Sequence, residues 1–494
     1  MTSNLTIVPV ALPMAAGIAL IFTRGHPGLS RSLALLANTA GLIVACALVG
    51  RVRDEGIQTL VFGGWPAPFG IAFAVDMLGA LMVLVTMVVS TATLVFACWS
   101  IDDARERTFF YSLFQFLLMG VNGAFLTGDL FNLFVWFEVL LISSYALMAL
   151  GSEPYQLQET FKYLVMNALS SALFLVGIAL IYSLTGTLNM ADLVAKFAAV
   201  DQPGLSAATA AVFLVVFGIK GGLFPLYVWL PRSYFGPPTV ISGLFGGLLT
   251  KVGVYALYRT VSLLFAANVA FTLPVLLFIG GATMLFGVLG ALAQWDFKRI
   301  LSYHIVSQIG YMIMGLGLFT RLALAGGIFY IVHHILVKTA LFLIAGAVEK
   351  RRGTTYLPQL GGMIDTAPAL TGLFLVAGLS LAGAPPLSGF VAKLMLIRSG
   401  LDESAYVIVF VSVVVSFLTL FSMMKIFRYA FWSVQQQSEI VETGRAARMS
   451  AVVSLVVLGV VLGLWASWAL PYAMLAADQL LDTSDYVTAV LGAK

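Results

Sequence analysis

The sequence has few charged residues. Asp, Glu, Lys and Arg make up only 10% of its 494 residues, whereas a soluble globular domain has about 25%. Hydrophobic residues make up 61%, and the mean hydropathy is +1.01. Because apolar runs recur along nearly the whole chain, the composition leaves no room for a soluble domain or a long linker. It predicts a single integral domain of the inner membrane over residues 1–494.

The sequence also lacks the features of several function classes. No basic patch lies on a soluble face, so binding to nucleic acid is excluded. The only two cysteines, Cys46 and Cys98, lie inside apolar runs, and we expect small core residues there and no disulfide or metal site. The chain has no dinucleotide-binding fingerprint, haem motif or cysteine cluster. We therefore expect no cofactor, and any redox centre would belong to another chain.

What the sequence does contain is a series of apolar runs long enough to cross a bilayer, which takes about 20 residues. We expect about 14 transmembrane helices, at residues 5–23, 32–50, 72–100, 108–124, 126–150, 161–184, 205–231, 239–263, 271–294, 299–319, 322–348, 369–399, 403–430 and 449–473. The predicted fold class is an all-α polytopic membrane protein.

Prolines interrupt the seventh and the twelfth of these spans. They are Pro225 and Pro231 in the seventh span, and Pro385 and Pro386 in the twelfth. Proline breaks a helix, and a break survives in lipid only where protein or a polar cavity satisfies the backbone. Broken helices at matching positions are typical of inverted repeats in transporters. We expect two inverted five-helix repeats, at 108–263 and 271–430; the alternative is that the prolines only kink each helix.

The basic residues of the loops predict the orientation. With the N-terminus outside, the inside loops contain Arg24, Arg31, Arg105, Arg107, Lys162, Arg232, Lys298, Arg299, Lys350, Arg351, Arg352, Arg428, Arg445 and Arg448. The outside loops contain Arg51, Arg53, Lys196, Arg259, Arg321, Arg398 and Lys494. Because the inside loops have twice as many basic residues as the outside loops, we expect both termini on the outer side.

The remaining basic residues are all lysines inside apolar spans. They are Lys220, Lys251, Lys338, Lys393 and Lys425. A charge at mid-bilayer costs about 3 kcal/mol or more, and a buried lysine can release its proton, whereas an arginine cannot. These lysines therefore favour proton transfer over fixed charge. The alternative, pairing or snorkelling, fits Lys425, because Arg428 and Trp432 mark the end of its helix.

Three carboxylates also lie in or beside apolar spans. Glu138, in FNLFVWFEVLLISSYALM, needs a cationic partner or a proton. Asp129 lies nine residues earlier, about 13 Å along the helix axis, and we expect it to be a cap or an entrance residue. Asp76 begins the third span and is ambiguous in the same way. Glu138 is thus the strongest candidate acid.

The eleventh span, FYIVHHILVKTALFL, combines histidine with lysine. His334 and Lys338 are four residues apart and share a face, whereas His333 points about 100° away from His334. A lone buried histidine is more often a hydrogen-bonded core residue, but a lysine one turn away favours proton transfer. We expect no metal here, because no cysteine or carboxylate cluster accompanies the histidines.

Two glycines precede Lys251 in the eighth span. Gly243 and Gly247 are four residues apart, and small residues at this spacing permit close helix contact. They would let Lys251 face a neighbouring helix such as the one that carries Lys220.

Several stretches resemble a known family: GDLFNLFVWFEVLLISSYALM, GIKGGLFPLYVWLPRSYFGPPTVISGLFGGLLTKVGVYALYR, FKRILSYHIVSQIGYMIMGLGL and GAPPLSGFVAK. They resemble the antiporter-like subunits of respiratory complex I and their relatives, and the resemblance covers nearly the whole chain. The LPRSYFGPPTVISGLFGGLLTK and WFEVLLISSYAL segments are most similar to the D-type subunits of multisubunit Mrp-type Na⁺/H⁺ antiporters. Complex I subunits usually have an acidic residue where this chain has Arg232.

The resemblance implies 14 helices, two inverted five-helix repeats and a buried proton relay. The implied relay residues are Glu138 in the fifth helix, Lys220 in the seventh, Lys251 in the eighth, His334 and Lys338 in the eleventh, and Lys393 in the twelfth. Some relatives have glutamate at the position of Lys393. We use the name relay residues for these six.

The predicted function is proton translocation in an antiporter for Na⁺ or another monovalent cation, and the chain is not expected to be an enzyme. Glu138 and Lys220 would form a pair that controls how readily the lysine releases its proton. Lys251 and His334 would pass the proton to Lys393, with water filling the gaps. The expected partners are H⁺, Na⁺, membrane lipid and other subunits of a hetero-oligomeric antiporter complex.

Two alternatives remain open. The same relay would serve a proton-pumping subunit of complex I or of a membrane-bound hydrogenase, driven by electron transfer on partner chains. The chain would otherwise be a scaffold whose lysines only form structural pairs. The sequence contains no compact group of convergent oxygen ligands, which a hard cation needs, so whether Na⁺ passes through this chain or a partner stays open.

Overall fold

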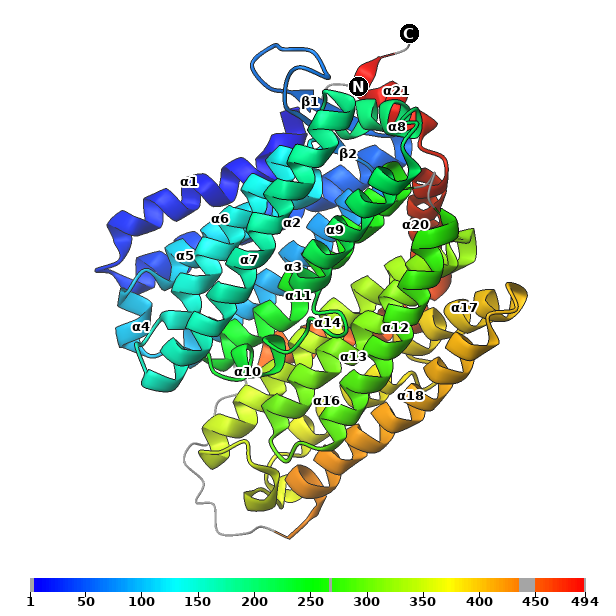
Figure 1. Ribbon diagram of the computed structural model, residues 1–494. Coiled ribbons are helices and arrows are strands. Elements are labelled where there is room, and N and C mark those ends of the chain that lie inside the picture. The colour runs from blue at the N-terminus through cyan, green and yellow to red at the C-terminus, as the bar shows by residue number, and fades with distance from the viewer. Residues whose placement is uncertain (1–3, 266–268, 435–448, 493–494) are drawn as a thin grey trace.

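The chain folds into one large helical bundle, as a computed structural model that describes residues 4–265, 269–434 and 449–492 shows (Figure 1). The first half contains η1 (Asn4–Ile7), α1 (Val8–Thr23), α2 (Pro27–Glu55), β1 (Gln58–Val61), β2 (Ala72–Val75), α3 (Met77–Ser100), α4 (Asp103–Arg107), α5 (Phe110–Leu126), α6 (Leu130–Ala149), α7 (Pro154–Thr185), α8 (Met190–Ala198), α9 (Pro203–Gly221), α10 (Leu230–Ser233) and α11 (Thr239–Leu263). The second half contains α12 (Val269–Leu292), α13 (Phe297–Leu318), α14 (Arg321–Arg352), η3 (Leu357–Gln359), α15 (Met363–Thr366), α16 (Pro368–Ala382), α17 (Ser388–Asp402), α18 (Tyr406–Ile426), η4 (Phe427–Trp432), α19 (Ser450–Leu464), α20 (Ala466–Leu481) and α21 (Ser484–Leu491).

The helices have the length and composition of a multi-pass membrane protein. Among the described residues, ten helices are long and apolar enough to cross a bilayer, or eleven if the bent pair α19 and α20 forms one span. The helices α5 and α16 are apolar but shorter, and α13 covers another predicted span. Each predicted span therefore contains helix, and the all-α membrane class is confirmed, while the count of 14 stays a prediction.

Both predicted interruptions occur. The helix α9 ends at Gly221, and regular helix resumes only at α10, from Leu230. The helix α16 ends at Ala382, and α17 begins at Ser388. Pro225, Pro385 and Pro386 lie in these breaks, where a proline would remove a hydrogen-bond donor from a helix and clash with its preceding turn. Pro231 lies in the first turn of α10, where proline is tolerated. Both spans are therefore broken rather than kinked. The grouping into inverted repeats at 108–263 and 271–430 stays a prediction.

Two predicted spans differ from the structure. The segment 72–100 was expected to be one helix, but Ala72–Val75 is strand β2, which pairs antiparallel with β1. The first helical residue after it is Met77. The segment 449–473 was also expected to be one span, but α19 and α20 meet at an angle of 83°. In both segments, hydrophobic residues lie on either side of the point where the backbone changes direction, and that point has no glycine or proline. The sequence therefore contains no signal for either change.

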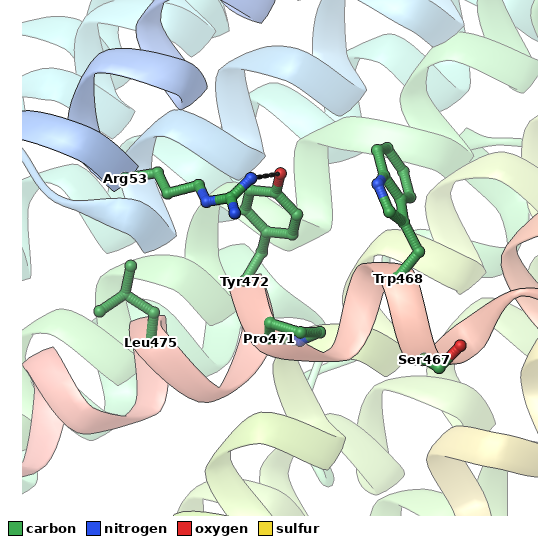
Figure 2. A pocket seen from close by; sticks show the side chains of 6 residues that line it. All are labelled: Arg53, Ser467, Trp468, Pro471, Tyr472 and Leu475. Atoms are coloured by element: carbon green, nitrogen blue, oxygen red, sulfur yellow. Dashed lines mark hydrogen bonds between the residues drawn. The ribbon is translucent and has the colours of Figure 1, made fainter.

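The helix α20 packs against the end of α2 beside a pocket of about 310 Å³. The Nη1 of Arg53 donates a hydrogen bond of 3.0 Å to the Tyr472 hydroxyl, and the guanidinium lies 5.5 Å from the centre of the tyrosine ring (Figure 2). The other lining residues are Ser467, Trp468, Pro471 and Leu475. This contact holds the turned C-terminal segment against the end of the bundle that carries the β1–β2 hairpin.

Two expectations for single residues were wrong. Cys46 was expected in the core, but it is exposed on α2, and Cys98 is half-buried; both thiols are free. An apolar run does not distinguish the outward face of a membrane helix from its inward face. Arg259 was expected in an outer loop, but it lies inside α11 and is 2% exposed, because it forms an ion pair with Asp76.

The two ends of the bundle differ in their elements (Figure 1). The elements η1, α8, α21 and the β1–β2 hairpin lie at one end, and α4 and α10 lie toward the opposite end. The elements α4 and α10, which both contain basic residues expected inside, thus lie toward the same end. Arg445, Arg448 and Lys494 lie outside the described residues.

An ion pair at the α4 end ties two segments together. Arg31 donates hydrogen bonds of 2.6 and 2.7 Å to the two carboxylate oxygens of Glu106, and the Tyr111 hydroxyl donates another of 2.7 Å. Burial raises the pKa of Glu106, but these hydrogen bonds outweigh burial and hold the pKa below its ordinary value. The carboxylate therefore stays charged and links α2, α4 and α5 at this end.

Candidate functional site

The predicted pair of Glu138 and Lys220 is joined by a third residue. The Ser171 hydroxyl on α7 donates a hydrogen bond of 2.5 Å to Glu138 Oε1. The Lys220 ammonium donates one of 3.3 Å to the same hydroxyl and lies 4.7 Å from the centre of the Phe137 ring. Lys220 is 4% exposed, and Glu138 is half-buried. The Ser171 hydroxyl on α7 thus links the Lys220 ammonium on α9 to the Glu138 carboxylate on α6 through two hydrogen bonds.

The helix break beside Lys220 fixes where the lysine lies. The helix α9 ends one residue later, at Gly221, and Gly222 adopts a positive φ of 74°, which glycine accommodates without a steric penalty. The indole Nε1 of Trp229 donates 3.1 Å to the Ile219 carbonyl, which also accepts a hydrogen bond from the Gly222 amide. The break therefore places the lysine at the end of a helix inside the bundle.

Lys251 lies on α11 and is fully buried. Its ammonium donates a hydrogen bond of 2.5 Å to the Gly246 carbonyl. Among the described residues, it has no carboxylate partner. A lysine without a counter-charge in this environment is expected to exchange its proton readily.

The glycines of α11 pack differently from the prediction. A Cβ at Gly247 would overlap with Thr339 Oγ1, and one at Gly243 would lie 3.4 Å from the Cβ of Phe342. Both glycines therefore face α14. The close contact with α9 comes instead from Gly253, where a Cβ would lie 2.6 Å from the Gly221 amide nitrogen.

The two relay residues on α14 are fully buried. The Lys338 ammonium donates 3.0 Å to the Leu301 carbonyl on α13. Neither ring nitrogen of His334 has a hydrogen-bond partner among the described residues. Gly247, one turn before Lys251, packs against Ile335 and Thr339, the sequence neighbours of His334 and Lys338. The structure therefore brings Lys251, His334 and Lys338 together where α11, α13 and α14 pack.

Lys393 lies against backbone carbonyl oxygens that are exposed at the second helix break. Its ammonium donates 2.9 Å to the Ala382 carbonyl and 3.3 Å to that of Leu381, both in the last turn of α16, where carbonyls lack helical partners. It also donates 3.1 Å to Ser416 Oγ and lies 4.5 Å from the centre of the Tyr311 ring. The break thus supplies the oxygen atoms that solvate this lysine.

Two further buried histidines were not selected from the sequence. His304 Nε2 lies 2.9 Å from Ser422 Oγ, which links α13 to α18. His333 Nδ1 lies 2.8 Å from Ser388 Oγ, the first residue of the helix that carries Lys393. Both are ionisable residues inside apolar runs, the signal that identified the lysines. His333 therefore belongs to the site, although it points away from His334.

Uncharged polar side chains lie between the histidines and Lys393. The Tyr330 hydroxyl hydrogen-bonds to Gln308 Oε1, and the Gln308 amide donates 3.3 Å to Thr419 Oγ1. The Tyr311 hydroxyl lies 2.8 Å from Ser416 Oγ, which also contacts Lys393. These groups line the space between the titratable residues with hydrogen-bond donors and acceptors.

Lys425 was expected to form structural contacts, and Asp129 was expected to be a cap or an entrance residue. The Lys425 ammonium donates 2.7 Å to the Gln294 carbonyl and 3.1 Å to that of Leu292, and lies 3.8 Å from the centre of the Trp295 ring. It therefore caps the end of α12. Asp129 is the N-cap of α6 and accepts a hydrogen bond of 2.8 Å from the Asn132 amide.

Broken helices and a buried line of lysines and histidines are features of membrane proteins that move ions. A family described as NADH:quinone oxidoreductase/Mrp antiporter, TM matches residues 127–419, and the chain belongs to this family.

Individual relatives match over nearly the full length. The chain is 51% identical over 490 residues to the D-type Na⁺/H⁺ antiporter subunit of Alkalihalophilus pseudofirmus, and 42% identical over 491 residues to that of Bacillus subtilis. Each alignment covers 99% of both proteins. One protein in the structure of the Mrp complex from a Dietzia species is 33% identical, with a TM-score of 0.92 over 99% of this chain and 100% of that one.

A respiratory relative shares the fold at lower identity. One protein of the archaeal membrane-bound sulfane sulfur reductase is 26% identical, with a TM-score of 0.91 over 99% of this chain and 100% of that one. The Mrp-type relatives are thus the more similar of the two groups in sequence.

Proposed function

We propose that this chain is the proton-translocating subunit of a multisubunit Na⁺/H⁺ antiporter, and that its six relay residues carry the proton. The observation that supports this most strongly is the line of buried ionisable groups from Glu138 to Lys393, which crosses both broken helices. Charges at this depth are costly to bury, and lysine and histidine can both release a proton. The chain is a secondary transporter subunit rather than an enzyme.

In the proposed route, the Glu138–Ser171–Lys220 chain holds a proton at one end, since the carboxylate favours the charged lysine. Lys251 and His334 receive it at the centre, with Lys338 close to both. Lys393 holds it at the other end. Water would connect the groups that the side chains do not bridge, because polar atoms line the intervening space.

We also propose which membrane contains the chain and on which side its termini lie. The chain would lie in the bacterial inner membrane with both termini on the outer side, because the end that carries α4 and α10 has most of the basic loop residues. A tag at the C-terminus should then be labelled from outside intact cells, and labelling only after permeabilisation would reverse this orientation.

A proton-pumping subunit of complex I or of a membrane-bound hydrogenase is the second candidate. Its support is the fold shared with the sulfane sulfur reductase protein. The identity of 51% with an antiporter subunit against 26% with the reductase protein favours the antiporter.

We expect that the chain alone does not catalyse antiport. It has a set of groups for moving protons, but its sequence contains no compact group of convergent oxygen ligands, which a hard cation needs. A coupled exchanger needs both ions to bias the same state, so a partner subunit should complete the sodium path. Purified chain in liposomes should show at most a proton leak, with no Na⁺-dependent pH change.

The complete complex, reconstituted in the same lipid, is the positive control and should exchange Na⁺ for H⁺. Exchange by the isolated chain at the rate of the complex would contradict this expectation. It would place the sodium path inside these 494 residues.

A further inference from the structure

A second buried ionic group lies on the same helix as Lys251. Lys251, Tyr255 and Arg259 are spaced four residues apart on α11 and share one face. Arg259 therefore lies about 12 Å along the helix axis from Lys251, toward the end of the bundle that carries the β1–β2 hairpin. Arg259 and Asp76 are both almost completely buried, and neither is a relay residue.

The hydrogen bonds of this pair leave the carboxylate fully engaged. The two terminal nitrogens of Arg259 each donate 2.7 Å to a different oxygen of Asp76. The Gly79 amide donates a further 2.9 Å to Asp76 Oδ1, because Asp76 is also the N-cap of α3. A carboxylate held by a bidentate arginine and a backbone amide is a poor proton acceptor.

The hydroxyl between Lys251 and Arg259 is also occupied. Tyr255 donates a hydrogen bond of 2.8 Å to the Phe125 carbonyl and accepts one of 3.1 Å from Arg259. Its proton therefore points to a backbone carbonyl that cannot pass it on. The Lys251 ammonium is directed to the Gly246 carbonyl, which precedes it on α11, away from Arg259.

The C-terminal helices cover the pair from the hairpin end. The Arg259 guanidinium lies 5.3 Å from the centre of the Tyr486 ring, on α21. The Gln479 side chain on α20 accepts a hydrogen bond of 2.8 Å from the Met77 amide, next to Asp76. In Figure 1, α21 lies beside the β1–β2 hairpin at this end. The pair is thus enclosed by protein on the side that faces away from Lys251.

We propose that Arg259, by holding Asp76 in an ion pair, is a barrier that stops protons from passing between Lys251 and the hairpin end of the bundle. Arginine does not release its proton in proteins, and its two hydrogen bonds to Asp76 keep the carboxylate from accepting one. The inference rests on the proposed function only in treating Lys251 as part of the relay.

The test measures proton leak through the complete complex in proteoliposomes, without Na⁺ and with an imposed pH gradient. Arg259→Gln leaves Asp76 as a buried, unpaired carboxylate that can accept a proton, and the leak should rise severalfold above wild type. The matched control is the double variant Arg259→Met with Asp76→Leu. It removes both charges and leaves no carboxylate that could accept a proton, so it should stay as tight as wild type.

Three other results would each overturn the proposal. An Arg259→Gln complex as tight as wild type would overturn the barrier. Equal leaks in the single and double variants would assign the effect to damaged packing and would also overturn it. If Arg259→Gln does not assemble, Arg259→Lys replaces it and should leak, since lysine can release its proton; failure of both to assemble would assign the pair to folding and overturn the proposal.

Adding Lys251→Met to Arg259→Gln separates the barrier from the proposed function. The leak should disappear if protons reach the pair through Lys251. A leak that persists would contradict the relay role of Lys251, whereas the comparison of single and double variants would still decide whether the pair excludes protons.

Discussion

Complexes that carry Lys220→Ala or Glu138→Ala should assemble in the membrane but lose Na⁺-driven proton exchange. Each change leaves one charged residue buried beside Ser171 without its counter-charge, and it removes one of the groups that hold the proton. Because proton transfer by a positioned side chain typically contributes a factor of 10² or more, the exchange rate should fall at least about a hundredfold. Na⁺-dependent quenching of a pH-sensitive dye in vesicles measures the rate, and immunoblotting of the complex measures assembly.

Two further variants control for the hydrogen bonds of this pair. Glu138→Gln keeps a hydrogen-bond acceptor for Ser171 but removes the charge, so it should also lose exchange. Ser170→Ala changes the neighbouring serine of α7, whose hydroxyl donates 2.9 Å to the Val216 carbonyl instead, and it should exchange normally. Near-normal exchange with Glu138→Ala or Lys220→Ala would remove the pair from the mechanism.

Lys393→Arg should reduce exchange to background, although it preserves the positive charge. The carbonyls of Leu381 and Ala382 that solvate the lysine would also accept hydrogen bonds from a guanidinium. The guanidinium would keep its proton throughout the cycle, whereas a relay residue must release it. Lys393→Glu and Lys393→His can still exchange a proton and should retain more activity than Lys393→Arg in the same vesicle measurement.

The ranking of these three variants distinguishes proton transfer from fixed charge. If Lys393 only supplies charge, Lys393→Arg should equal wild type and Lys393→Glu should be the most impaired. That order would contradict a relay role at this position.

The sequence was sufficient to predict features that a single stretch of the chain reveals. A lysine, histidine or glutamate inside an apolar run is conspicuous because burial of its charge is costly, which led to Glu138, Lys220 and Lys393. Paired prolines inside apolar runs similarly predicted both helix breaks. These properties depend on the residue and its immediate neighbours, so they needed no knowledge of packing.

The missed features depend on contacts between distant segments. Ser171 lies 33 residues from Glu138, and Asp76 lies 183 residues from Arg259. A serine in a membrane helix is ordinary, and an arginine near the end of a span resembles a loop residue. Gly243 and Gly247 did predict a close helix contact, but hydrophobicity that extends all round α11 gave no indication that α14 was the partner.

The central claim is that the protons exchanged for Na⁺ pass through the buried residues of this chain, and Lys251 tests it most directly. Lys251 has no carboxylate partner among the described residues, so Lys251→Met removes a proton carrier without leaving an unpaired acid. Lys425→Met is the matched control, because that lysine caps the end of α12.

The measurement is the Na⁺-driven pH change in proteoliposomes that contain equal amounts of complete wild-type or variant complex. We expect Lys251→Met to abolish the pH change and Lys425→Met to retain it. A wild-type pH change with Lys251→Met would show that protons cross elsewhere and would contradict the relay.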